Sequence, residues 1–126
     1  FKVESGPRIT HRLLSLRQPP EAIFSASNLL TLGVLKAVRE AGLRIPEDLA
    51  LVGFDDMPWA SELYAPLTAI VQPTYELGQE AMRVLLRRRS DPDRPIQTVT
   101  LRTSLIVRES CGALRRKEGD SSDILS

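Results

Sequence analysis

An unbroken apolar run, Leu49–Phe54, constrains the fold more than any other feature, and it ends directly at two carboxylates, Asp55 and Asp56. The run does not alternate apolar and polar residues, which is typical of a strand buried on both faces. Such strands occur in parallel sheets whose two faces are covered by helices. The run therefore predicts an α/β fold with a parallel sheet flanked by helices.

The rest of the chain divides into segments that fit this alternation of strands and helices. Apolar residues spaced as on one helix face predict a helix from Ser5 toward the Pro19-Pro20 stop, and the same spacing recurs after Ser27 or Asn28, either of which can cap a helix. A third amphipathic helix is expected over Tyr75–Arg89. Further strands are expected at 22–26, 67–71 and 99–107, one or two helical turns at 59–64, and a loop at 90–95.

Composition excludes several classes of protein. Seventeen basic and sixteen acidic residues give a net charge of +1, which argues against a dedicated nucleic-acid module. A single cysteine excludes an internal disulfide framework and a multi-cysteine metal site, and the lone His11 reads as a surface residue, so we expect neither metal nor cofactor. No apolar run approaches the roughly 18–20 residues of a membrane span, so an intracellular, soluble chain is expected. Because the sequence opens on Phe1, we expect a fragment or a processed chain.

Candidate ligand-binding residues follow the predicted strands. Ligands of parallel α/β sheets bind beyond the carboxyl ends of the strands, where Ser27, Asn28 and Asp55 are expected. One interpretation has Asp55 accepting hydrogen bonds from ligand hydroxyls while Asp56 caps the next short helix; the other has both merely capping and solvating the strand end. Neighbouring strand residues point in opposite directions, so the pair is not expected to work as an acid–base couple.

Several motifs, in this order and spacing, resemble the LacI/GalR family of transcriptional regulators: GLRIPEDLALVGFDD, PLTAIVQP, ELGQEA and LIVRES. The resemblance extends from about Gly6 to Gly112. It implies one lobe of a two-lobed, periplasmic-binding-protein-like domain that binds a sugar or another small metabolite between its lobes. Residues 1–112 would then form an incomplete effector-binding domain, and residues 113–126 a mobile polar tail.

The resemblance also implies roles for individual residues. The family's effector-binding aspartate falls on Asp55, and Gln72 and Thr74 fall on a segment that lines the cleft. The family commonly has Asn-Asp where this chain has Ser27 and Asn28. Family dimers pair through surfaces onto which Leu32, Leu35, Trp59 and Leu63 map. DNA would be bound only through a helix-turn-helix domain that these 126 residues lack. The resemblance also implies that the regulator is located in the cytoplasm.

Two other functions compete with this interpretation. A sugar-binding protein of a transport system has a similar fold, whereas the VGFDD and LIVRES motifs favour the regulator. An enzyme that uses the strand-end aspartates would need a further acid and a partner lysine, which neither Lys36 nor Lys117 supplies. The resemblance finally implies that the helix over Tyr75–Arg89 packs on a first lobe that the chain lacks. We therefore expect its apolar stripe to fold back or, preferentially, to dock on a second copy; the stripe comprises Leu77, Ala81, Met82, Leu85 and Leu86.

Overall fold

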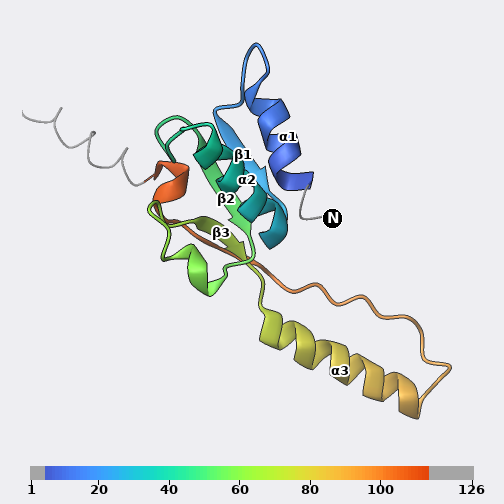
Figure 1. The fold of residues 1–126 in the computed structure, drawn as a ribbon. Coiled ribbons are helices and arrows are strands. Elements are labelled where there is room, and N and C mark those ends of the chain that lie inside the picture. Colours follow the sequence, from blue (N-terminus) through green and yellow to red (C-terminus); the bar gives the residue numbers. More distant parts are fainter. Residues whose placement is uncertain (1–4, 114–126) are drawn as a thin grey trace, which may run out of the picture. The chain divides into compact units, whose positions relative to one another are not determined.

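A computed structural model describes residues 5–113 and has the predicted alternation of helices and strands (Figure 1). The predicted mobile tail lies outside the described residues, except for Ala113. The helices and strands are α1 (Ser5–Leu14), β1 (Ala22–Ser25), α2 (Asn28–Glu40), β2 (Ala50–Phe54), β3 (Thr68–Val71), α3 (Thr74–Ser90) and β4 (Ser104–Ile106), with 3-10 turns η1 (Pro58–Ala60) and η2 (Glu109–Cys111).

The four strands form one sheet in the order β1-β2-β3-β4. β1 and β2 are parallel with Ser25 opposite Gly53, and β2 and β3 are parallel with Val52 opposite Thr68. The α/β class predicted from the apolar run is therefore confirmed. The parallel arrangement also means that β1 and β2 end at the same edge of the sheet, which is where the candidate site lies.

The hydrophobic core lies between β2 and α2. Leu51 of β2 is fully buried, and Val34 and Val38 of α2 contact the same cluster, together with Leu49 and Leu67 from the segments that lead into β2 and β3. Alternate residues of β2 are buried and the residues between them are half-buried, so neither side of the strand is fully exposed, which fits its lack of polar alternation.

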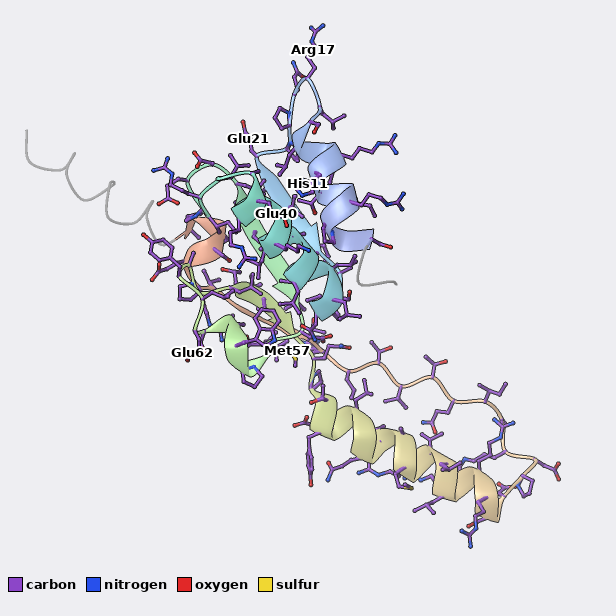
Figure 2. The ribbon with its side chains drawn as sticks, viewed as in Figure 1. His11, Arg17, Glu21, Glu40, Met57 and Glu62 are labelled. Carbon is purple, nitrogen blue, oxygen red and sulfur yellow. The ribbon has the colours of Figure 1, made fainter. Side chains whose placement is uncertain are left out.

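α1 packs against α2 at a close approach of two glycines. A Cβ on Gly33 would lie 2.7 Å from the Cα of Gly6, so the two helix backbones nearly touch. His11 of α1 and Glu40 of α2 are also joined, 2.8 Å between Nε2 and Oε2 (Figure 2). His11 is partly exposed, as its sequence position suggested, but it has a structural partner.

The described residues fall into two units. One unit runs to Val71 and resumes at Leu105, and the other comprises Gln72–Ser104, which is α3 with the chain that follows it. Within the second unit an extended segment returns along α3 (Figure 1). No residue of α3 is buried, and its stripe side chains Leu77, Met82, Leu85 and Leu86 are each at least half exposed.

The predicted strand over 99–107 is wrong for most of its length. Only Ser104–Ile106 forms a strand, and residues 99–103 have no regular structure. Val99 and Leu101 instead line a hollow beside α3. An alternating pattern indicates only that one side of an extended segment is apolar. In residues 99–103 that side lies beside helix α3 rather than beside a neighbouring strand. None of the helices in the described part of the chain is long and apolar enough to cross a membrane.

Candidate functional site

Asp55 stands at the carboxyl end of β2, at a change in backbone direction. Its φ of 72° lies in the left-handed region, the only such value among the described residues other than glycine. That conformation costs a non-glycine residue roughly 1–3 kcal/mol, although Asp and Asn tolerate it better than most. The Asp55 amide nevertheless continues the sheet, because its N–H donates to the Ile70 carbonyl at 2.9 Å. A strained polar residue at a strand end is a frequent feature of binding sites.

Ser27 and Asn28 stand at the equivalent point beyond β1. Ser25 and Gly53 are opposite each other, so Ser27 and Asp55 each lie two residues beyond this pair, at the same sheet edge. Ser27 caps α2, since its Oγ accepts a hydrogen bond from the Leu30 N–H at 3.4 Å. The capping role predicted for Ser27 or Asn28 thus belongs to Ser27, whose hydroxyl hydrogen is not used by the cap.

Asn28 is the first residue of α2, and its amide oxygen is buried. That Oδ1 atom has no hydrogen-bond partner among the residues the structure describes. Burying an amide oxygen without a donor is costly, so the position favours a donor from outside the described chain. The edge therefore combines a carboxylate, a hydroxyl and an amide, which suits a ligand rich in hydroxyl groups.

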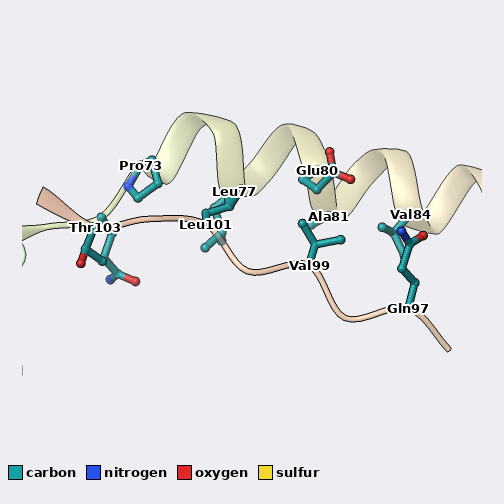
Figure 3. A pocket seen from close by; sticks show the side chains of 10 residues that line it. Pro73, Leu77, Glu80, Ala81, Val84, Gln97, Val99, Leu101 and Thr103 are labelled. Carbon is teal, nitrogen blue, oxygen red and sulfur yellow. The ribbon is translucent and has the colours of Figure 1, made fainter.

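Gln72 and Thr74 belong to the other unit. Gln72 follows directly after β3 and is half-buried, and Thr74 begins α3 and is exposed. Gln72 lines a hollow of about 230 Å³ between α3 and the returning segment, together with Leu77 and Leu101. Figure 3 shows Leu77 and Leu101 in this hollow. The structure thus brings Ser27, Asn28 and Asp55 to one edge and places Gln72 and Thr74 in the second unit.

The expected capping role of Asp56 is wrong. The turn η1 begins after Met57 and has no side-chain cap. The Asp56 carboxylate instead binds Arg108 through two parallel hydrogen bonds, Nη1 to Oδ1 at 2.7 Å and Nη2 to Oδ2 at 2.8 Å. Arg108 holds the pKa of the Asp56 carboxyl below its usual value, and Asp56 raises the pKa of the guanidinium in return. The two neighbouring aspartates therefore differ: Asp56 serves structure, and Asp55 remains the candidate for ligand binding.

Sequence reasoning gave Arg108 no role, although it recognised the LIVRES motif that contains it. The pair joins residues 52 positions apart, and no local pattern signals such a contact. Nor do three or more acidic, histidine or cysteine side chains gather into a metal site anywhere in residues 5–113.

The residues expected at a dimer interface all belong to the first unit. Leu32 of α2 is 47% exposed, whereas Leu35, Trp59 and Leu63 are half-buried and pack against the core. Sequence reasoning did not single out Tyr64, which is 98% exposed and lines a hollow of about 410 Å³ with Leu35 and Leu63. Large aromatic rings are seldom so fully exposed to solvent, and tyrosines are enriched at protein interfaces.

Comparison with known proteins identifies the family. The periplasmic binding protein-like domain matches residues 2–111. The HTH-type transcriptional repressor CytR of Escherichia coli K12 is 39% identical over 114 residues, which cover 90% of this chain and 33% of the repressor. This chain spans about a third of the length of the curated relatives it matches.

Solved structures agree with the sequence relatives. The transcriptional regulator CelR in complex with cellobiose superposes with a TM-score of 0.79 at 37% identity, over 87% of this chain and 34% of that one. A LacI family regulator from Enterococcus faecium with bound ribose superposes with a TM-score of 0.75 at 31% identity, over 87% of this chain and 40% of that one. The chain belongs to the periplasmic binding protein-like domain family, and the relatives named here are transcriptional regulators.

Proposed function

We propose that this chain is the effector-sensing and dimerisation part of a bacterial transcriptional regulator. A sugar or another small metabolite binds between two lobes, of which the first unit supplies one face. Binding controls a helix-turn-helix domain outside this sequence, and the chain itself carries out no chemical reaction. The regulator works in the cytoplasm, and its subunits form a homodimer.

The observation that carries the proposal is the shared edge of β1 and β2. Asp55, Ser27 and the unsatisfied Asn28 oxygen stand there together, and two proteins of this fold hold cellobiose and ribose. Sugars present adjacent hydroxyl groups. A carboxylate accepts hydrogen bonds from such hydroxyls, and an amide or hydroxyl side chain can both donate hydrogen bonds to them and accept hydrogen bonds from them. A sugar-binding transport protein remains the second candidate on fold alone; the named relatives are repressors, which favours the regulator.

The test is a titration of the chain with ribose and with cellobiose, followed by the amide resonances of Ser27 and Asp55. We expect the shifts to centre on these two residues. Replacing Asp55 with Ala removes a hydrogen-bonded carboxylate and should weaken binding by about 1–3 kcal/mol, roughly 5- to 150-fold. The matched control is Asp93→Ala, an exposed aspartate of the second unit, which should leave the titration unchanged. An Asp55→Ala chain that titrates like the wild type would remove Asp55 from the site.

The regulator and the transport protein differ in what the gene encodes upstream. A helix-turn-helix segment preceding this sequence supports the regulator. A secretory signal peptide in its place contradicts the proposal and favours transport.

A further inference from the structure

Asp55 keeps a strained backbone conformation, so something must hold it. On its amino-terminal side the restraint is the sheet, through the Asp55 N–H to Ile70 carbonyl bond at 2.9 Å. No strand follows Asp55, because β2 ends at Phe54 and the next element is the short turn η1. On its carboxyl-terminal side the next residue, Asp56, is held through its side chain.

Arg108 binds the residue that follows Asp55. Its guanidinium forks onto both oxygens of Asp56, and its Nη1 also donates to the Leu67 carbonyl at 2.7 Å. Both side chains are about four-fifths shielded from solvent, with 21% of Arg108 and 19% of Asp56 exposed. A forked pair fixes orientation as well as distance, which a single hydrogen bond does not.

Arg108 is itself held rigidly. Its N–H donates to the Thr68 hydroxyl at 2.9 Å, and that hydroxyl donates back to the Arg108 carbonyl at 3.1 Å. Two residues on, Ser110 is buried; its Oγ donates to the Leu51 carbonyl at 2.6 Å and accepts from the Thr68 N–H at 2.8 Å. The segment that carries Arg108 is thus bonded to both β2 and β3.

We infer that Arg108 is a positioning residue for the ligand-binding carboxylate: by clamping Asp56 it helps to hold Asp55 in its left-handed backbone conformation at the carboxyl end of β2. That Asp55 binds a ligand is part of the proposed function, and the inference rests on it to that extent. The two restraints on Asp55 also come from the two segments that connect the units. Ile70 precedes the connection at Val71, and Arg108 follows the connection at Leu105.

Hydrogen exchange in the 126-residue chain tests the clamp without any ligand. The probe is the Asp55 amide, and the reference is the Leu51 amide in the core of β2. Arg108→Gln should speed exchange at Asp55 at least tenfold relative to Leu51. A merely structural role would lower the protection of both amides together and leave their ratio unchanged, which would overturn the inference.

The chain offers a matched control. Arg44 forks onto Asp48 in the same way, with 3.1 Å from Nε to Oδ2 and 3.3 Å from Nη2 to Oδ1, on the surface of the same unit. Arg44→Gln should leave the Asp55 to Leu51 ratio unchanged. Asp56→Asn, which keeps the size of the side chain, should raise the ratio severalfold and decides the matter if Arg108→Gln fails to fold.

A second variant asks whether backbone strain is what the clamp opposes. Glycine adopts the left-handed region without strain, so in an Asp55→Gly chain the added Arg108→Gln change should raise the exchange ratio at residue 55 less than threefold. An undiminished tenfold rise in that background would contradict the positioning role.

Ribose and cellobiose titrations of the Arg108→Gln chain separate this inference from the proposed function. A wild type that binds either sugar, and a variant that binds it at least tenfold more weakly, support both. A wild type that binds neither contradicts the proposed ligand, while the exchange ratio still decides whether Arg108 positions Asp55. Unchanged sugar affinity in a variant with a raised ratio would show that the clamp does not serve binding.

Discussion

The two adjacent aspartates make different predictions for pH. The pKa of Asp56 is lowered by its hydrogen bonds to Arg108, so its folded value lies below its unfolded value. The stabilisation from such a group is fully present above the unfolded pKa, near 4, and is lost as the pH falls through the folded pKa. Asp56→Asn should therefore cost about 1–2 kcal/mol of unfolding free energy at pH 7. The difference from wild type should shrink below pH 4, as measured by urea unfolding at pH 7 and pH 3.

The control for that measurement is Asp48→Asn. The pKa of Asp48 is lowered by Arg44 in the same way, but the pair is solvated, so the loss at pH 7 should be smaller. A difference for Asp56→Asn that stays constant from pH 7 to pH 3 would rule out the ion pair as its source.

Gly33 provides a prediction from packing. A Cβ at this position would lie 2.7 Å from the Gly6 Cα, a backbone atom that cannot rotate away. Alanine gains about 1 kcal/mol in helix propensity, whereas overpacking costs about 1–3 kcal/mol, so Gly33→Ala should destabilise the chain by up to about 2 kcal/mol. Gly78 in α3 has nothing within 4 Å of such a Cβ. Gly78→Ala should therefore not lower the urea midpoint, and equal losses for both variants would refute the packing argument.

At the scale of elements, the sequence predicted the features that arise locally. The Ser27 cap at the start of α2 and the strand β2 follow from neighbouring residues, and the structure places each within one or two residues. The left-handed Asp55 and the Asp56–Arg108 pair depend on segments far apart in the chain. The strand expected over 99–107 failed for the same reason, because its partner surface is α3.

α3 should be the least stable helix of the described chain. It buries no residue, whereas α2 buries five. Most helical stability in proteins comes from tertiary packing, so α3 amides should exchange at least tenfold faster than those of α2. Gly78→Ala should slow exchange in α3 and leave α2 unchanged. Equal protection of the two helices in the wild type would show that α3 has a partner surface in solution.

The whole chain should not recognise DNA by itself. Its net charge is +1, and specific binding requires base contacts from a positioned element. We expect no specific retardation of an operator fragment by these 126 residues at physiological salt. A shift that survives excess nonspecific DNA would contradict this, and would locate a DNA-binding surface within the chain.

Two apolar surfaces compete to form the homodimer, one on each unit. The first unit offers Leu32 and the fully solvated Tyr64, and the second offers the α3 stripe, represented by Leu85. A symmetric dimer uses each interface residue twice, and burying a leucine contributes roughly 1.5–3 kcal/mol. A charged residue in place of the leucine that lies in the interface should therefore raise the dissociation constant of the dimer at least a hundredfold. The family resemblance places the dimer surface at Leu32, which differs from the docking expected for the α3 stripe. We therefore expect sedimentation equilibrium at micromolar concentration to show a dimer that Leu32→Glu converts to monomer and Leu85→Glu does not. The reverse pattern would place the interface on α3, and a monomeric wild type would exclude both surfaces.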